Sequence, residues 1–330
     1  MFGKRSIRYC GALLAGWLCC ASALADYAAH PRALSLIEEL VSEHGFDRRE
    51  LTQLLAAAER KQSILDAMSR PAEKTKPWHE YRRIFLTARR EREGIAFLRE
   101  HRATLARAQA QTGVPAELIV AVIGVETYYG RIAGSYLVID ALSTLAFDYP
   151  ARAAFFSREL EQFLLLAREQ GLDPLTLKGS YAGAMGYGQF MPSSYRAYAV
   201  DFDDDGVADI WNNPVDAIGS VANYLARHGW RAGEPVVSPA DAAVEPPQDL
   251  FSGGLKPQRA VREFAAAGLR PQHPVDPAAA ATALRFELED GYEYWLGLHN
   301  LYVITRYNHS AMYAMSVYQL SQRIAAGARG

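Results

Sequence analysis

The sequence predicts a mainly helical α+β protein in which one small β-containing insert interrupts the helices late in the chain. Apolar residues recur at three- and four-residue spacing through most of 31–228, which is the period of an amphipathic helix. From about Gly233 prolines become frequent and short β-like runs such as 283–288 appear. We therefore expect an export signal over 1–25, a helical N-terminal domain over 26–80, a helical core over 81–232, a β-containing insert over 233–300, and a return to the core over 301–330.

The first 25 residues have the pattern of an export signal. Three basic residues precede an apolar stretch over about 11–24, and Ala23-Leu24-Ala25 gives the small-x-small pattern of a cleavage site. The apolar stretch is short for a membrane span. We expect a mature chain that begins near Asp26 and is exported to the periplasm.

All three cysteines, Cys10, Cys19 and Cys20, fall inside this signal, so the predicted mature chain has none. An exported protein of this size can be held together by its core without disulfides. Trp17-Leu18 lacks the small residue usually found before a lipid-anchored cysteine, so the sequence favours a soluble form over an anchored one.

The charge balance argues against a nucleic-acid partner. The whole chain has 35 basic and 37 acidic residues, and loss of the signal removes three basic residues, which leaves 32 basic against 37 acidic. Nucleic-acid binding usually requires a basic patch, and this composition does not indicate one.

The helical part divides at its glycines and prolines. Residues 31–70 have apolar side chains at helical spacing, and Pro71 and Pro77 bracket a break. Residues 81–111 have the pattern of a long, charge-rich pair of helical segments. Further helices are expected from Gly113-Val114-Pro115 to a stop at Gly130, over 140–170, and over 214–228 with Gly229 past the end.

Residues 178–191 depart from this pattern. Gly179, Gly183, Gly186 and Gly188 fall within the stretch, and each would cost stability inside a helix. We expect a loop whose backbone passes close to another group.

Glu126 is the residue that points most strongly to chemistry. Eight uncharged, mostly apolar residues precede it, and two tyrosines and a glycine follow. An isolated glutamate usually lies on the wet face of a helix, but this run is apolar on nearly every face and indicates a buried helix. Burial disfavours the ionised form, so the pKa of the carboxyl should rise and Glu126 can serve as a general acid.

The residues alone leave two alternatives open: a structural role for Glu126, and a reaction that uses a second carboxylate. Arg131 or Arg152 could pair with Glu126 and make it structural. A glycosidase of the usual kind needs a second carboxylate. Asp140 and Asp148 are the candidates downstream, although both lie where helix caps are expected.

Residues 201–212 match the calcium loop of an EF-hand. Asp201, Asp203 and Asp205 fall at loop positions 1, 3 and 5, glycine falls at position 6, and Val207 offers its carbonyl at position 7. A merely acidic turn does not explain this alternation.

The last loop position departs from the motif. Asn212 stands where a bidentate glutamate is expected, and asparagine offers a single neutral oxygen. We expect a structural Ca²⁺ site that binds weakly, with Asp209 or Asp216 as compensating ligands.

Other chemistries lack their motifs. The sequence has no His-x-His or His-Glu-x-x-His spacing, no Gly-x-Ser-x-Gly elbow and no phosphate-binding P-loop. We expect no organic cofactor. Tyrosines cluster near the segments above, where they suit either a core or the flat faces and hydroxyl edges of sugars.

Five segments together resemble the lytic murein transglycosylase B family. They are Val122–Thr127, Gly179–Ser194, the 201–212 loop, Asp216–Tyr224 and Tyr302–Asn308. The resemblance covers nearly the whole mature chain, and the motifs are long, ordered and jointly specific.

The resemblance implies a lysozyme-like helical core and cleavage of the β-1,4 bond between N-acetylmuramic acid and N-acetylglucosamine, with a 1,6-anhydromuramoyl product. It implies glycan strands of peptidoglycan as the partner, with cell-wall synthesis or turnover proteins as further candidates. The family's catalytic glutamate falls on Glu126. Its glycan-contacting residues fall on Ser180, Gln189, Tyr307, Asn308 and Tyr313, with weaker matches at Tyr81 and Arg152, and its calcium ligands fall on Asp201, Asp203, Asp205 and Val207, with Asn212 in place of the closing aspartate.

The family mechanism explains why no second carboxylate stands out. Glu126 first acts as acid, the substrate's own N-acetyl group stabilises the positive charge, and Glu126 then acts as base toward the C6 hydroxyl. The alternatives are a hydrolytic muramidase that uses Asp140 or Asp148, and a non-catalytic peptidoglycan-binding protein.

Overall fold

The computed structural model describes residues 27–69 and 76–329. The predicted export signal with its three cysteines lies outside these residues, as does Pro71 of the expected break. Over the described residues the chain is mostly helical with one small sheet near its end, as the sequence predicts.

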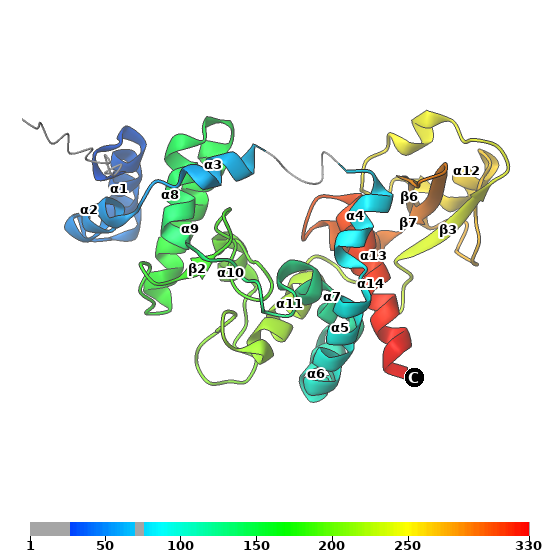
Figure 1. The fold of residues 1–330 in the computed structure, drawn as a ribbon, viewed down its shortest axis with the longest axis horizontal. Helices are drawn as coiled ribbons and strands as arrows, with labels where there is room; N and C mark the ends of the chain where they lie inside the picture. Colours follow the sequence, from blue (N-terminus) through cyan, green and yellow to red (C-terminus); the bar gives the residue numbers. More distant parts are fainter. Residues whose placement is uncertain (1–26, 70–75, 330) are drawn as a thin grey trace, which may run out of the picture.

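The first helices pack against a later part of the chain (Figure 1). They follow a short 3-10 turn, η1 (Tyr27–Ala29), and their apolar residues, such as Leu40 and Leu55, belong to the same core as the central helices. Their packing partners are α8 (Val138–Asp148) and α9 (Ala153–Glu169). The helices are α1 (Pro31–His44), α2 (Arg48–Ala57) and α3 (Gln62–Met68).

The predicted helical pair over 81–111 consists of three helices. They are α4 (Trp78–Phe85), α5 (Ala88–Glu100) and α6 (Arg102–Thr112). Thr87 separates the first two because its side chain caps α5 by accepting from the Arg90 N–H. Helix α4 begins at Trp78, so the boundary expected at 80/81 falls inside a helix.

Helix α7 (Ala116–Thr127) lies in the middle of the molecule and is buried on nearly every face from Leu118 to Val125 (Figure 1). The expected stop at Gly130 is wrong, because the last helical residue is Thr127 and its C-cap is Tyr128. Tyr128 and Tyr129 already adopt the left-handed conformation, with φ of 54° and 61°. Their N–H groups bond back to the carbonyls of Gly124 and Ile123, which satisfies the last turn of the helix before the glycine is reached.

The segment after α9 is irregular, as predicted. Strand β1 (Tyr136–Leu137) pairs with β2 (Lys178–Gly179), and tight turns continue to Phe190. Two helices follow, α10 (Pro192–Tyr198) and α11 (Pro214–Arg227). The second agrees with the predicted helix over 214–228.

The insert contains a five-stranded antiparallel sheet with the order β4-β6-β7-β3-β5. It has a small apolar core of its own, which includes Leu250, Phe264 and Leu296. The elements are β3 (Val237–Ala242), η4 (Gln248–Phe251), β4 (Arg259–Ala260), α12 (Val261–Ala266), β5 (Leu269–Pro271), β6 (Ala280–Glu287) and β7 (Tyr292–Gly297).

The chain then returns to the helical core through α13 (His299–Thr305) and α14 (Ala311–Arg329). Helix α14 packs along α7, α5 and α4. This return brings the end of the chain beside the helix that carries Glu126.

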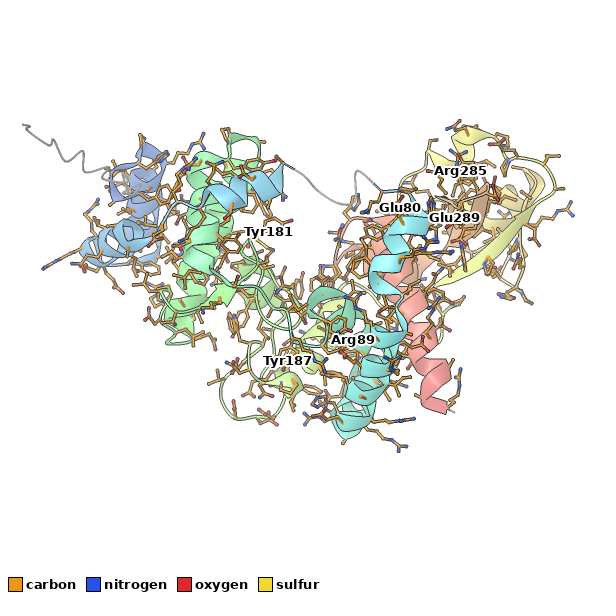
Figure 2. All side chains as sticks on the ribbon, viewed as in Figure 1. Glu80, Arg89, Tyr181, Tyr187, Arg285 and Glu289 are labelled. Atoms are coloured by element: carbon orange, nitrogen blue, oxygen red, sulfur yellow. The ribbon has the colours of Figure 1, made fainter. Side chains whose placement is uncertain are left out.

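Helix α4 joins the insert to this core. The Trp78 ring lies 4.9 Å from the Phe286 ring of β6, and its indole N–H donates to a Glu293 carboxylate oxygen over 2.6 Å. Glu289 of the insert also forms an ion pair with Arg83 of α4, and Figure 2 labels Glu289 beside this helix.

Among the described residues, no single helix has both the length and the apolar composition needed to cross a membrane. Helices α6 and α7 satisfy that test only as a pair, and they meet at a bend of 112°.

Candidate active site

Glu126 is the second-last residue of α7 and is partly buried. Its partner is Tyr313 on α14, whose hydroxyl donates to Glu126 Oε1 over 2.5 Å. The Tyr313 side chain is only 2% exposed. Burial and the nearby Glu126 charge raise the pKa of the Tyr313 hydroxyl well above its usual value, so this group stays a donor at working pH.

Tyr307 lies in the same aromatic surroundings. Its hydroxyl donates to the Gly188 carbonyl over 2.6 Å, and its ring lies 4.6 Å from that of Tyr224. Burial raises the pKa of both hydroxyls, that of Tyr224 to about 12, and the charge of Glu126 contributes to both shifts. Asn308 follows directly and is partly buried. The Tyr302–Asn308 segment thus contacts residues 178–191, the Gly-rich loop, through the Tyr307 hydroxyl.

The Gly-rich loop holds its two predicted site residues by their own side chains. Ser180 Oγ accepts from the Ala184 N–H at 3.0 Å and closes a tight turn. Gln189 Nε2 donates to the Ala133 and Gly186 carbonyls, both at 3.1 Å. Position 134, where the segment after α7 passes the Gly-rich loop, requires a glycine. A Cβ at Gly134 would lie 2.0 Å from the Gly179 carbonyl oxygen. The loop is therefore fixed against the segment that follows α7.

Tyr81 and Arg152 have different surroundings. Tyr81 on α4 is 3% exposed and lies near enough to Tyr313 to affect the pKa of that hydroxyl. Arg152 is exposed on the short helix η3 (Pro150–Arg152), with its guanidinium 4.3 Å from the Phe155 ring centre. Arg131, the other cation considered for Glu126, forms an ion pair with Glu93.

Asp140 and Asp148 bind the N-terminal helices to α8. Asp140 accepts from the Glu59 N–H over 2.8 Å, and Asp148 accepts from the Tyr27 hydroxyl over 2.6 Å. The expectation that both are helix caps is wrong, because Leu137 and Tyr149 are the caps of α8. Asp140 lies within the first turn of α8 and Asp148 is its last residue, and both accept from the docked N-terminal segment.

The predicted calcium loop gathers three carboxylates. Asp201, Asp203 and Asp205 each place one oxygen within 4.8 Å of the other two. Asp201 accepts from the N–H groups of Asp205 and Gly206, at 3.1 and 2.7 Å, which curls the loop around the group. The three carboxylates are hard oxygen donors close to one another, and they fit Ca²⁺.

The other acidic residues of this region are engaged differently. Asp216 is fully buried and accepts from the N–H groups of Phe202 and Asp209, at 2.7 and 2.8 Å, so it fixes the backbone of both halves of the loop. Burial first, and then the charges of Asp203 and Asp201, raise the pKa of Asp216. Asn212 turns its amide N–H group to the Asp209 carboxylate at 3.1 Å.

Comparison with known proteins decides the family. The transglycosylase SLT domain family matches residues 29–322. The chain belongs to this family. It is 48% identical, over 309 residues, to the membrane-bound lytic murein transglycosylase B of Escherichia coli K12, a match that covers 91% of this chain and 84% of that one.

Solved structures of lytic transglycosylases share the whole fold. The soluble lytic transglycosylase SltB1 of Pseudomonas aeruginosa is 54% identical and matches 91% of this chain and all of that chain, with a TM-score of 0.86. The Escherichia coli lytic transglycosylase Slt35 in complex with calcium is 47% identical and matches 92% of this chain and 96% of that one, with a TM-score of 0.84. The predicted lytic transglycosylase family, enzyme class and lysozyme-like, mainly helical fold are confirmed.

Two cavities of this lytic transglycosylase lie away from Glu126. Cavities of about 700 and 600 Å³ lie between α6 and α14 and between α13 and the insert, and Glu126 lines neither. We locate the site by Glu126 and its hydrogen bond with Tyr313, because an acid–base reaction depends on the proton donor and its position.

Sequence reasoning missed Thr127 and Tyr224. Thr127 is 1% exposed and its hydroxyl reaches the Gly-rich loop, while Tyr224 packs on Tyr307 and donates to the Arg306 carbonyl. The position of Thr127 directly after the candidate acid is the one signal that could have singled it out. Nothing in the local pattern distinguishes Tyr224 from a core tyrosine.

Proposed function

We propose that this lytic transglycosylase cleaves the β-1,4 bond between N-acetylmuramic acid and N-acetylglucosamine in peptidoglycan and leaves a 1,6-anhydromuramoyl end. The observation that carries the proposal is the pairing of Glu126, at the end of an apolar helix, with the Tyr313 hydroxyl 2.5 Å away. A single carboxylate suffices when the substrate supplies both the neighbouring group and the nucleophile.

In the first step, protonated Glu126 gives its proton to the glycosidic oxygen, and the bond from that oxygen to the anomeric carbon breaks. The carbonyl oxygen of the N-acetyl group on the N-acetylmuramic acid bonds to the anomeric carbon of that sugar and takes up the positive charge. In the second step, ionised Glu126 accepts the proton of the C6 hydroxyl. The C6 oxygen bonds to the anomeric carbon as the N-acetyl oxygen leaves, so no water is consumed and Glu126 is protonated again.

Between the two steps the Tyr313 hydroxyl supports the ionised carboxylate. Hydrogen bonds to charged groups are stronger than neutral ones. The raised pKa of Tyr313 keeps the proton on its own oxygen, so the tyrosine donates without competing as an acid.

We assign glycan contacts to Ser180, Gln189, Tyr307, Asn308 and Tyr81. Their support is the hydrogen-bonded loop around Ser180 and Gln189, and the closeness of Tyr307 and Tyr81 to the Glu126–Tyr313 pair. Arg152 stays a prediction from the resemblance, as an outlying glycan contact.

Product analysis tests the reaction. Purified sacculi treated with the enzyme should release anhydromuramoyl products, and Glu126→Gln should release none while its melting temperature stays near that of the parent. Products heavier by one water, with a reducing muramic acid, would favour a hydrolytic muramidase. The bonds that Asp140 and Asp148 make to the N-terminal helices argue against them as its second acid.

We also propose that the 201–212 loop binds a structural Ca²⁺ through Asp201, Asp203, Asp205 and the Val207 carbonyl. The gathered carboxylates support this, as does the calcium complex of the related Slt35. Asn212 is a poor closing ligand because its amide N–H group is directed to Asp209. The ion would stabilise the loop by neutralising three adjacent negative charges.

We place the mature protein in the periplasm after removal of residues 1–25, where peptidoglycan glycan strands are its substrate. The relatives include a membrane-bound and a soluble transglycosylase, and Trp17-Leu18 before Cys19 supports the soluble form. We assign catalysis to 81–232 together with 301–330.

A further inference from the structure

Thr127 follows Glu126 directly and is buried, with 1% of its surface exposed. Its hydroxyl accepts from the Gly130 N–H at 2.9 Å and lies 2.8 Å from the Tyr187 carbonyl. A weaker contact of 3.2 Å reaches the Ile123 carbonyl one turn back in α7. A hydroxyl has one proton, so the shorter distance assigns it chiefly to Tyr187, 60 residues away in sequence.

The first bond holds an unusual turn. Tyr128, Tyr129 and Gly130 are three consecutive residues with positive φ, of 54°, 61° and 83°. Left-handed backbone is unfavourable at residues other than glycine, so such a turn persists only where its surroundings fix it. Thr127 supplies one of those restraints.

The second bond fixes the Gly-rich loop at Tyr187, which Figure 2 labels together with Tyr181 of the same loop. The Tyr187 ring lies over Gly130, where a Cβ would come within 2.1 Å of it. On its other side the Tyr187 N–H donates to the Ile210 carbonyl of the 201–212 loop over 2.9 Å. The Tyr187 backbone is therefore held between α7 and the candidate calcium loop, two residues before Gln189.

We infer that Thr127 is a positioning residue, whose hydroxyl sets the Glu126 carboxyl in register with the loop that carries Ser180 and Gln189. This inference rests on the proposed role of Glu126. Proton transfer to a bound sugar requires the acid and the sugar-binding groups to hold one geometry, and a misplacement of about 1 Å can cost on the order of 100-fold in rate. The contact with the Tyr187 carbonyl, 60 residues away, goes beyond what is needed to end the helix locally.

Thr127→Val tests this inference, because valine keeps the shape of threonine and removes the hydroxyl. On soluble glycan fragments we expect kcat to fall about tenfold or more, since the displaced acid and loop no longer meet the sugar together. Thr127→Ser should recover most of the kcat. Each kcat is divided by the folded fraction measured by circular dichroism at the assay temperature.

Thr112→Val is the matched control. Thr112 ends α6 with local bonds alone, because its hydroxyl donates to the Ala108 carbonyl at 2.6 Å and accepts from the Val114 N–H at 3.2 Å. The Thr112→Val variant should have a lower melting temperature than the parent but the same kcat. If Thr127→Val is too unstable to assay, Thr127→Ala in the presence of 5 mM Ca²⁺, compared with Thr127→Ser, makes the same distinction.

Two results would overturn the inference. One is a folded Thr127→Val enzyme with the parental kcat, and the other is a loss of kcat that vanishes on division by the folded fraction. Glu126→Gln assayed in parallel separates the two proposals. If Glu126→Gln is inactive while Thr127→Val is fully active, only the positioning role fails, whereas activity in Glu126→Gln overturns the proposed function itself.

Discussion

Glu126 and the three aspartates of the 201–212 loop have the same functional group in opposite surroundings. Glu126 lies near the end of a helix buried from Leu118 to Val125 and accepts from the Tyr313 hydroxyl. Asp201, Asp203 and Asp205 lie within 4.8 Å of one another at the surface. A single carboxyl near apolar groups can exchange one proton, whereas adjacent carboxylates repel one another until a cation joins them. Their surroundings, rather than their residue type, assign the chemistry.

The two sites are also connected. The Tyr187 carbonyl accepts a hydrogen bond from the Thr127 hydroxyl, and the Tyr187 N–H donates to the Ile210 carbonyl of the 201–212 loop. One backbone unit therefore lies between the candidate acid and the candidate cation site. Variants on either side can show whether the two sites act separately.

The largest effect is expected for Glu126→Gln. Glutamine keeps the size of the side chain but cannot give or accept the proton, so activity on sacculi should fall by at least about 10²–10⁴-fold. The control is Glu117→Gln, which alters a glutamate in the first turn of the same helix. Release of anhydromuropeptides, followed by mass spectrometry, should stay near the parental level in the control.

A smaller effect is expected for Tyr313→Phe. The variant loses the donor to Glu126 Oε1, and hydrogen bonds to charged groups contribute about 1.5–3 kcal/mol, so kcat/KM should fall by roughly 10- to 100-fold. Tyr318→Phe on the same helix is the control. Equal rates in the two variants would mean that the carboxylate needs no support from this hydroxyl.

The candidate cation site should affect stability more than rate. Saturating calcium should raise the melting temperature by about 2–6 °C, which corresponds to a gain of the order of 1–2 kcal/mol. Asp203→Asn should abolish the rise, because it removes one of three charged ligands. Asp204→Asn should keep it, since loop position 4 supplies no ligand in this motif. A rise that persists in Asp203→Asn would place calcium elsewhere.

The smallest effect concerns His228, which stacks on Tyr224 at 4.1 Å in the aromatic surroundings of the acid. Burial lowers the pKa of His228 below its usual 6.5. Between the pKa of His228 in the folded protein and about 6.5, the unfolded chain therefore binds more protons than the folded protein. The free energy of unfolding rises with pH across this window and falls again as the pH is lowered through it. His228→Gln should lose about a degree less than the parent between pH 7.5 and 5, and exposed His309→Gln should behave as the parent.

Local patterns predicted much of this protein because they report local physics. The apolar run before Glu126 specifies a buried helix. The proline-rich shift after Gly233 marks the insert, whose strand β6 (Ala280–Glu287) covers all but the last residue of the β-like run over 283–288. The alternating aspartates fix a loop geometry within a dozen residues. In each case the residues that determine the feature are neighbours in sequence.

The errors have the opposite origin. The sequence placed caps at Asp140 and Asp148, but their partners are Glu59 and Tyr27, more than 80 residues earlier. It ended α7 at Gly130, but bonds back into the helix from two tyrosines end it sooner. No local pattern carries information on such partners.

The sequence by itself singled out Glu126 as the candidate acid, the three aspartates as a candidate cation loop and a shift in composition near Gly233, because apolar periodicity and motif spacing act over a few residues. Only the tertiary structure decided that Tyr313 is the partner of Glu126 and that Thr127 joins the acid to the Gly-rich loop. Tyr313 is 187 residues from Glu126 in the chain. A hydrogen bond across that separation depends on how α14 packs against α7, and this packing is a property of the whole folded core.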